Sequence, residues 1–336
     1  MSIKWTNTDL AIFSAFAKMT QKELHLSMKT YLSKYYNKSI STKDFIYCEG
    51  NIPVMLVAHM DTVFKKPPKD IYYDPKKFIL WSPQGLGADD RAGVFLIWKI
   101  IEQGYRPSIC LTTDEEVGGI GAHNVIKKFP KKPTDLKYII ELDRQGSNDC
   151  VFYSCANQQF ENYVEDFGFV TDFGTFTDIC IICPQWKIAG VNLSVGYKNE
   201  HSISETLNTR MLLDTFTKVC KMLDNINESL YFEYIEDTYE KYYTNLIRRY
   251  GSSLFPREDD YAFEMNNLYC QCSKCHKDFL EDDLFIVQTE NNGRKYVCLD
   301  CIGSNIDWCK KCGEPFEKKD NQEICYSCLR KEKDNG

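Results

Sequence analysis

The sequence predicts an α/β fold, with a central mixed, largely parallel sheet flanked by helices, followed by a small cysteine-rich module at the C-terminal end. Three observations lead to this prediction. Several short apolar runs end in polar residues, helix-like stretches lie between some of them, and nine of the sixteen cysteines fall between Cys270 and Cys328. Continuous apolar runs are typical of parallel strands, because helices cover both faces of a parallel sheet.

The first 48 residues are expected to be mainly helical. Residues 10–19 form an apolar stretch, and Thr20 and Glu23 have the spacing of a capping box, which predicts that a second helix begins there. Residues 45–47 and 54–58 are separated by a Gly-Asn-Ile-Pro break and are interpreted as two neighbouring strands. Further along, residues 205–223 have the pattern of an amphipathic helix that closes the domain.

Five segments place residues that can bind a metal at the end of an apolar strand or at the start of a helix. They are residues 53–63 with His59 and Asp61, 85–101 with Asp89, 108–119 with Glu115 and Glu116, 138–144 with Asp143, and 191–202 with His201. In open α/β sheets, ligands bind beyond the carboxyl ends of the strands, so these side chains are expected to meet. Two histidines and several carboxylates, without cysteine, suit zinc, cobalt or manganese.

Taken in order, these motifs resemble those of the co-catalytic di-zinc metallo-exopeptidases. This superfamily includes bacterial leucyl aminopeptidase, tripeptidase T, carboxypeptidase G and glutamyl aminopeptidase. The motifs that carry the resemblance are His59-x-Asp61, Gly-Ala-Asp89-Asp90, Glu115-Glu116, Asp143 and His201. The resemblance covers about residues 45–225 and implies the phosphorylase/hydrolase-like exopeptidase fold.

The resemblance also implies a role for each residue of the motifs. Asp89 would bridge two divalent metals, Glu115 would be the general base, and Asp61 would orient the ring of His59. One further pair of ligands would complete each metal site: His59 with Asp143, and Glu116 with His201. Zinc is the expected metal, with cobalt or manganese as alternatives. Asp178 and Arg144 are weaker candidates for contact with the substrate; Arg144, like Arg91, could receive a carboxylate or could be structural.

Spacing predicts a compact catalytic unit without a lid insertion. Asp143 and His201 are 58 positions apart, which leaves no room for the lid domain of the carboxypeptidase G and tripeptidase branch. His59 and Asp89 are 30 positions apart, which excludes the dimerisation insert of the glutamyl aminopeptidase branch. The layout is closest to the leucyl aminopeptidase branch, whereas the Gly-Ala-Asp-Asp-Arg-Ala-Gly sequence is nearer the tripeptidase branch, so the substrate stays open.

Length and composition set further bounds. A chain of 336 residues is expected to hold about two domains, here a catalytic domain over residues 1–228 and a cysteine-rich module over 269–330. An aromatic-rich helical bridge is predicted between them, over 229–268. The formal charge of −7 argues against a polyanion-binding protein. No run of about 18 apolar residues and no clear signal peptide occur, so no membrane association and a cytoplasmic location are expected.

Four Cys-x-x-Cys pairs in the tail predict two structural zinc ions, since two pairs supply four tetrahedral thiolates. The expected ligands are Cys272, Cys275, Cys298, Cys301, Cys309, Cys312, Cys325 and Cys328. Sequential pairing is the simple interpretation, and a cross-braced pairing of the first with the third is the alternative. The tail mixes acids with lysines, which favours a protein-facing or intramolecular role over nucleic acid. A fifth pair, Cys180 and Cys183, lies in an apolar run that is interpreted as a strand.

The expected function is therefore that of a metal-dependent exopeptidase. The first expectation is an aminopeptidase that hydrolyses peptide bonds with a water activated by two metals and with Glu115 as general base. One alternative is an amidohydrolase or deacylase that acts on an N-acyl or other non-peptide amide. The other is a binding or adaptor protein that uses the cysteine-rich module and in which the hydrolase domain is secondary. The sequence does not determine the oligomeric state.

Overall fold

The computed structural model divides the chain into two compact units, Met1–Tyr242 and Tyr243–Gly336. Of the predicted bridge over 229–268, the structure describes only residues 230, 232, 234 and 235, so its predicted helical character lies outside the described residues. The structure describes residues 4–153, 155, 158–174, 176–226, 230, 232, 234–235, 269–280, 284–289, 294–298, 301, 306–311, 315–319, 322–326 and 328–329.

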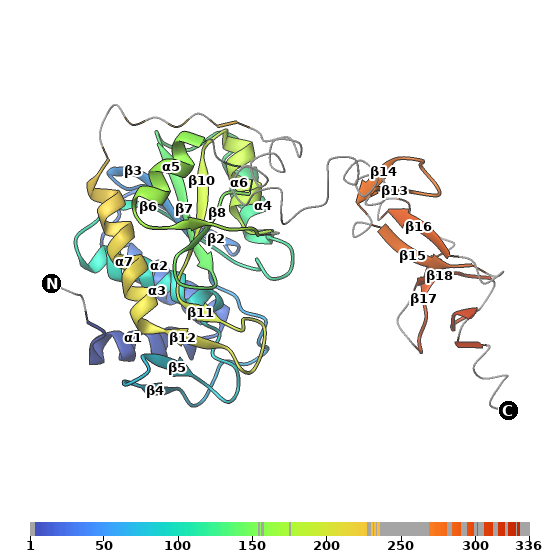
Figure 1. Ribbon diagram of the computed structural model, residues 1–336, viewed down its shortest axis with the longest axis horizontal. Coiled ribbons are helices and arrows are strands. Elements are labelled where there is room, and N and C mark those ends of the chain that lie inside the picture. The colour runs from blue at the N-terminus through green and yellow to red at the C-terminus, as the bar shows by residue number, and fades with distance from the viewer. Residues whose placement is uncertain are drawn as a thin grey trace, which may run out of the picture. The chain divides into compact units, whose positions relative to one another are not determined.

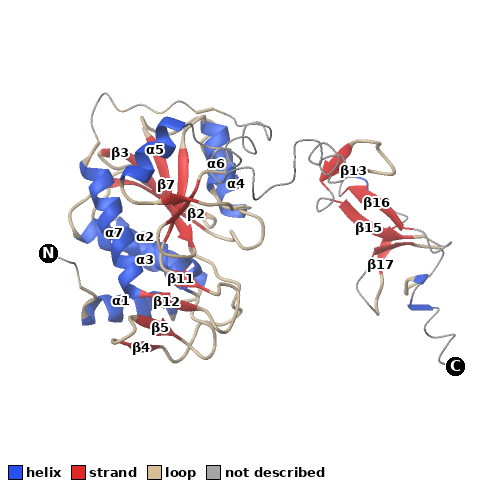
Figure 2. Cartoon of the chain, in the orientation of Figure 1, coloured by secondary structure: helices blue, strands red, loops and turns tan. Residues whose placement is uncertain are grey.

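An eight-stranded mixed sheet forms the centre of the first unit (Figure 1, Figure 2). Its order is β1-β2-β6-β3-β7-β10-β8-β9, and the four middle strands β6, β3, β7 and β10 run parallel. This confirms the predicted mixed, largely parallel sheet. The strands are β1 (Ser39–Ser41), β2 (Phe45–Cys48), β3 (Ile52–His59), β6 (Pro107–Thr112), β7 (Tyr138–Arg144), β8 (Asp149–Val151), β9 (Val170–Thr171) and β10 (Gly190–Ser194).

The prediction that residues 45–47 and 54–58 form neighbouring strands was wrong. β6 lies between them: Tyr47 of β2 pairs antiparallel with Cys110, and Leu56 of β3 pairs in parallel with Ile109. The reason is topological, because a strand that arrives later in the chain can insert between two earlier ones and leave no trace in their local pattern.

Helices cover both faces of the sheet. Along β3, Val54, Leu56 and Ala58 belong to one core, whereas the alternate residues Met55 and Val57 belong to a second core on the other face. The first core is covered by α1 (Asn7–Ala17), α2 (Gln21–Leu32), α3 (Ala88–Glu102), α5 (Gln158–Asp166) and α7 (Thr209–Asp224). The second is covered by α4 (Ile120–Lys128) and α6 (Ile179–Trp186).

Two of the helices test the expectations from sequence. The capping box of α2 is confirmed, since the Thr20 side chain accepts from the Glu23 amide and the Glu23 carboxylate accepts from the Thr20 amide. In contrast, the run around Cys180 is the helix α6 and not a strand. The buried residues of α6 recur with helical spacing, from Ile179 through Ile182 and Cys183 to Trp186. A short apolar run does not separate a buried strand from a buried helix, and here packing on the sheet decided.

A smaller four-stranded sheet lies beside the start of α3, in the order β11-β12-β5-β4. It joins residues that are far apart in sequence, because the hairpin of β11 (Tyr197–Lys198) and β12 (Thr206–Asn208) pairs with β5 (Ile79–Trp81), which pairs with β4 (Tyr72–Asp74). The strand β12 takes the first residues of the helix predicted over 205–223, so α7 begins only at Thr209.

The second unit consists of small sheets around cysteine clusters. β13 (Tyr269–Gln271) pairs with β14 (Asp278–Leu280), and a four-stranded sheet has the order β16-β15-β18-β17. Its strands are β15 (Leu284–Gln288), β16 (Arg294–Cys298), β17 (Ile306–Trp308) and β18 (Pro315–Glu317). In neither unit does a described helix have the length and apolarity that crossing a bilayer requires.

Candidate active site

The predicted metal-binding residues meet at the carboxyl edge of the parallel strands. β3 ends at His59, β6 ends at Thr112 just before the turn that carries Glu115 and Glu116, and β7 contains Asp143 near its end. Parallel strands finish at the same edge of a sheet, so three segments of distant sequence deliver their polar residues to one place.

Asp89 lies at the centre of this group. Its Oδ1 is 3.1 Å from His59 Nε2, and its Oδ2 is 3.2 Å from His201 Nε2, so one carboxylate lies between two imidazoles. Asp143 Oδ1 lies 3.5 Å from His59 Nε2, and Glu116 Oε2 lies 2.9 Å from His201 Nε2. The structure therefore brings together both predicted pairs, His59 with Asp143 and Glu116 with His201, on opposite oxygens of Asp89.

Asp61 and Glu115 flank the His59 ring. Asp61 Oδ1 lies 3.3 Å from His59 Nδ1, which leaves Nε2 directed at the carboxylates. The same Asp61 carboxylate accepts the backbone amides of Glu115 and Glu116, both at 3.1 Å, and so ties the end of β3 to the acidic turn. Glu115 Oε2 lies 3.9 Å from His59 Nε2, at the edge of the cluster.

The start of α3 is shaped to present Asp89. The peptide bond between Asp89 and Asp90 is cis, and both residues have non-helical backbone angles. The buried Asp90 carboxylate accepts the His59 amide at 3.2 Å and the Gly93 amide at 2.9 Å, and so joins α3 to β3. Gly93 is required by close packing, because a Cβ at this position would lie 2.1 Å from the carbonyl oxygen of Leu142 in β7.

Three residues that the sequence did not single out as part of the site hold Asp143. Tyr197 OH donates to Asp143 Oδ1 at 3.0 Å, and Thr177 Oγ1 donates to Asp143 Oδ2 at 3.2 Å. The Asn192 side chain accepts the Asp143 amide at 2.9 Å and donates to the Asp143 carbonyl at 2.7 Å. Each contact spans more than 30 positions of sequence, so no local pattern could have revealed it.

Glu205 is a fourth residue that sequence reasoning missed. It is 1% exposed, and its carboxylate accepts the consecutive backbone amides of Gly87, Ala88 and Asp89. The only available indication was its place four residues after His201, which does not by itself predict this contact.

The electrostatics of the cluster favour bound cations. Burial raises the pKa of Glu115 to about 8, of Glu116 to about 7 and of Asp143 to about 6, and the charges of neighbouring carboxylates add to this effect. Although burial opposes ionisation, hydrogen bonds from His201 and His59 lower the pKa of Asp89. Glu116 Oε1 is buried and has no hydrogen-bond partner in the described part of the chain. A buried set of carboxylates with two imidazoles and no thiolate fits two divalent metals with a preference for oxygen and nitrogen ligands.

The weaker substrate-binding candidates each have a hydrogen-bond partner within the protein. Arg144 donates to Asp172 Oδ2 at 2.8 Å, so its charge is compensated. Asp178 is fully buried, accepts a hydrogen bond from Thr112 Oγ1, and has its pKa raised to about 7 by burial. Arg91 is 3% exposed and donates to the Met19 carbonyl at 3.1 Å.

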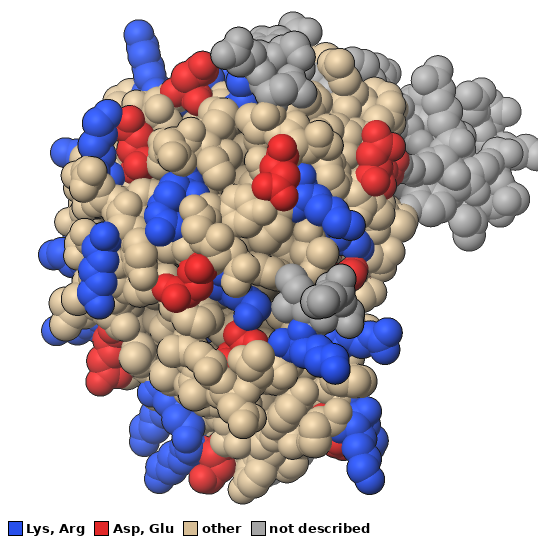
Figure 3. Space-filling model, turned by 90° about the vertical axis from the view of Figure 1, so that its left-hand side faces the viewer, with Lys and Arg blue, Asp and Glu red and all other residues tan. Residues whose placement is uncertain are grey.

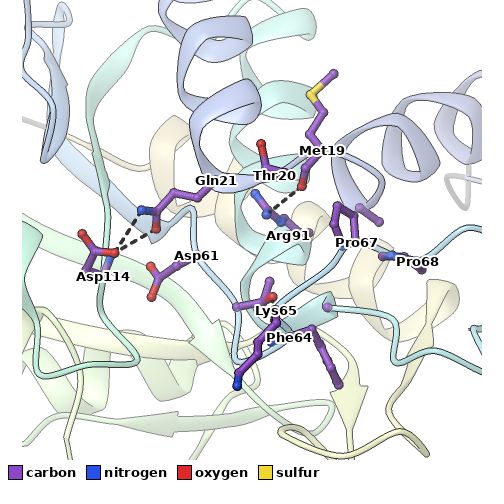
Figure 4. Close-up of a pocket in the computed structure, with 13 residues that line it drawn as sticks. Met19, Thr20, Gln21, Asp61, Phe64, Lys65, Pro67, Pro68, Arg91 and Asp114 are labelled. Atoms are coloured by element: carbon purple, nitrogen blue, oxygen red, sulfur yellow. Dashed lines mark hydrogen bonds between the residues drawn. The ribbon is translucent and has the colours of Figure 1, made fainter.

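A cavity of about 270 Å³ adjoins Asp61 (Figure 4). The start of α2, the loop after β3 and the start of α3 line it, and Gln21 bridges across to Asp114 through hydrogen bonds at 3.0 and 3.3 Å. Arg91 and Lys65 line it as well. The cavity therefore gives access to Asp61, the residue that links His59 to the acidic turn.

The cysteine clusters have the sequential arrangement. One ligand atom of each of Cys272, Cys275, Cys298 and Cys301 lies within 4.8 Å of the others, and the same holds for Cys309, Cys325 and Cys328. Cys312, the predicted fourth member of the second cluster, lies outside the described residues. The cross-braced alternative would join the first pair to the third, which is not the grouping found.

No family model matches the sequence, and no curated protein matches it. The fold, in contrast, is similar to that of solved peptidases. A tripeptidase from Staphylococcus aureus aligns with a TM-score of 0.50 at 14% identity, over 65% of this chain and 98% of the other. An aminopeptidase from the archaeon Desulfurococcus kamchatkensis gives 0.50 at 13% identity, over 68% and 98%.

A TET aminopeptidase from a marine-sediment Thaumarchaeota archaeon gives a TM-score of 0.50 at 12% identity, over 67% of this chain and 98% of the other. These likenesses show that the chain shares the fold of these peptidases. They confirm, for the fold, the resemblance to the metallo-exopeptidases that the motifs predicted.

Proposed function

We propose that the first unit is a metal-dependent exopeptidase, and specifically an aminopeptidase that removes residues from unblocked peptides. One observation carries the proposal: the Asp89 carboxylate lies between His59 and His201, at 3.1 and 3.2 Å, with Glu116 and Asp143 beside these imidazoles. The shared fold of solved aminopeptidases and a tripeptidase supports it.

The cluster residues would hold two divalent cations, zinc first and cobalt or manganese as alternatives. Such cations would supply Lewis acidity, which polarises a scissile carbonyl and lowers the pKa of a water. Asp89 would be shared between them, His59 and Asp143 would hold one, and Glu116 and His201 the other. Asp61 keeps the His59 ring oriented with Nε2 toward the cluster.

Glu115 would move the proton. Its Oε2 lies 3.9 Å from His59 Nε2, and Glu115 belongs to neither the His59–Asp143 pair nor the Glu116–His201 pair. A carboxylate at this place is suited both to accept a proton from water and to return it to the leaving amine.

The two arginine candidates are poorly placed to receive a substrate carboxylate. Arg144, a candidate to receive a carboxylate, is paired with Asp172 at 2.8 Å, and Arg91 is buried beside Met19. Arg144 is therefore not free to receive a substrate carboxylate, and Arg91 is only 3% exposed. This supports an aminopeptidase over a carboxypeptidase.

We further propose that the second unit binds two structural zinc ions through its cysteine clusters. Its apolar cores are small and contain the cysteines themselves, so metal binding would supply folding energy. On the face of the first unit seen in Figure 3, basic and acidic side chains are interspersed without a basic stripe. The sequence of the second unit mixes acids with lysines as well, so a protein partner is proposed for it, and nucleic acid is not.

Two measurements test the proposed function. Elemental analysis of the purified chain should find about four metal ions, of which a chelator removes two readily. An unblocked tripeptide should be hydrolysed with release of its first residue, and Glu115→Gln should reduce kcat by about 10²- to 10⁴-fold. Asp114→Asn, in the same turn, is the matched control and should leave the rate nearly unchanged.

Each other outcome supports a different function. Cleavage of N-acetylated substrates alone would replace the aminopeptidase by an amidohydrolase or deacylase. Absence of turnover on both classes, with two metals bound in the first unit, would favour the adaptor protein. Absence of metal from the first unit would overturn the proposal altogether.

A further inference from the structure

Glu205 makes a contact that the catalytic proposal does not account for. Its buried carboxylate accepts three consecutive backbone amides. Oε2 accepts the amides of Gly87 and of Ala88, the latter at 3.1 Å, and Oε1 accepts the amide of Asp89 at 3.0 Å. The contact is long-range, since between 116 and 118 positions separate the partners. One side chain thus fixes the backbone from which the Asp89 carboxylate projects.

The start of α3 needs such a partner. The first amides of a helix have no acceptor within the helix, and a residue at the N-cap position usually supplies one. Here the N-cap is Gly87, which has no side chain and makes no side-chain cap. The Glu205 carboxylate takes that place and accepts these amides from outside the helix.

The loop that carries Glu205 also carries His201. Pairing of Tyr197 with Leu207 and of Lys198 with Thr206 fixes the hairpin β11–β12 on either side of residues 199–205. Within the loop, Ser202 Oγ donates to the Asn199 carbonyl at 2.8 Å. His201 adopts a left-handed backbone with φ +60°, a conformation that persists only where the surroundings hold it.

One hairpin loop therefore holds Asp89 at two points. His201 Nε2 faces the side chain of Asp89 at 3.2 Å, and Glu205 binds its amide at 3.0 Å. We propose that Glu205 is a positioning residue that sets the bridging carboxylate of Asp89 and so couples the His201 half of the metal centre to the His59 half. This inference rests on the proposed di-metal site.

Substitution of Glu205 has a defined consequence. In Glu205→Gln, a single carbonyl oxygen replaces two carboxylate oxygens, and the new NH₂ group faces at least one backbone N–H. Both are donors, so at least one of the three amides loses its partner. Glu205→Asp keeps the charge but is one methylene shorter, so it should retain part of the contact. Substitution of a residue that orients a metal ligand through a hydrogen bond typically lowers metal affinity by about 10- to 100-fold.

The test measures binding of Mn²⁺ to the full chain. Mn²⁺ prefers oxygen and nitrogen ligands, so the thiolate clusters can keep zinc while a chelator clears the first unit. The free Mn²⁺ signal in electron paramagnetic resonance then gives the dissociation constants, without any substrate. We expect two Mn²⁺ ions in the wild type, affinity lower by about 10- to 100-fold in Glu205→Gln, and an intermediate value in Glu205→Asp.

Asp9→Asn provides the matched control. Asp9 is also a buried carboxylate, 2% exposed, that accepts an amide at a helix N-terminus, from Thr6 at 2.9 Å. Asp9 pairs with Lys99 of α3. Lys99 lies ten residues after Asp89, and at a helix rise of about 1.5 Å per residue this places the pair roughly 15 Å from Asp89, away from the proposed metal site. Asp9→Asn should lower thermal stability and leave Mn²⁺ affinity unchanged.

The outcomes distinguish a failure of the inference about Glu205 from a failure of the proposed di-metal function. If folded Glu205→Gln binds Mn²⁺ as the wild type does, Glu205 is merely structural and the inference is wrong. If Glu205→Gln does not fold, Glu205→Asp decides by the same affinity measurement. If the wild type itself binds no Mn²⁺ in the first unit, the proposed function fails before Glu205 is tested.

Discussion

Replacing Asp61 with asparagine tests whether one carboxylate holds the acidic turn and the His59 ring together. Asp61 Oδ1 accepts the Glu115 amide at 3.1 Å and lies 3.3 Å from His59 Nδ1, while Oδ2 accepts the Glu116 amide at 3.1 Å. An asparagine oxygen at the Oδ1 position keeps the first two contacts. Its NH₂ group then faces the Glu116 N–H, and since both are donors, that contact is lost.

The size of the effect follows from this single lost contact. A hydrogen bond to a charged group contributes about 1.5–3 kcal/mol. Because each 1.36 kcal/mol corresponds to about a tenfold change in rate, kcat/KM should fall by about 10- to 150-fold. The loss should appear mainly in kcat, because Glu116 and His59 belong to the proposed metal site and not to the part that binds the rest of a peptide.

The assay is release of the first residue from an unblocked tripeptide, with the metal site saturated and folding checked by thermal unfolding. Asp114→Asn is the control, because Asp114 precedes Glu115 in the same turn but is bonded to Gln21 at 3.0 Å instead. It should change kcat/KM by no more than about twofold. Near wild-type activity of Asp61→Asn, or an equal loss in Asp114→Asn, would refute the reasoning.

Three further predictions concern stability and metal content. Gly93→Ala should destabilise the first unit by about 1–3 kcal/mol in urea unfolding, because the new Cβ would lie 2.1 Å from the Leu142 carbonyl oxygen and push α3 away from β7. Lys99→Met should lower the free energy of unfolding by about 3–5 kcal/mol, because it removes the only cation paired with the buried Asp9 carboxylate among the described residues, at 2.6 Å. Cys298→Ser should remove one zinc ion per chain in elemental analysis, because it deletes one of four clustered thiolates.

Two of these have a control within the chain. Lys43→Met removes an exposed lysine whose ion pair is 3.9 Å long, and should change stability by less than about 0.5 kcal/mol. Cys48→Ser removes a buried thiol that belongs to neither cluster and should keep the zinc content unchanged. Unaltered stability in Gly93→Ala would contradict the close approach of α3 to β7.

The sequence alone determined the kinds of side chain that meet and the edge where they meet. His59, Glu115, Glu116 and Asp143 each lie at or just beyond the end of an apolar run, and the carboxyl ends of parallel strands converge. The α2 capping box was likewise readable, because Thr20 and its partner Glu23 are only three residues apart. In both cases the physical cause is local or follows from the strand direction, so it leaves a pattern in the chain.

Only the tertiary structure decided which residues hold the site in place and how the layers are ordered. β6 inserts between β2 and β3, and α6 is a helix where an apolar run had suggested a strand. Glu205, Asn192 and Tyr197 bind partners between 49 and 118 positions away. A buried amide or carboxylate must find a partner, but any segment that the fold brings near can supply it. Such contacts therefore depend on the packed arrangement and leave no periodicity or spacing in the sequence.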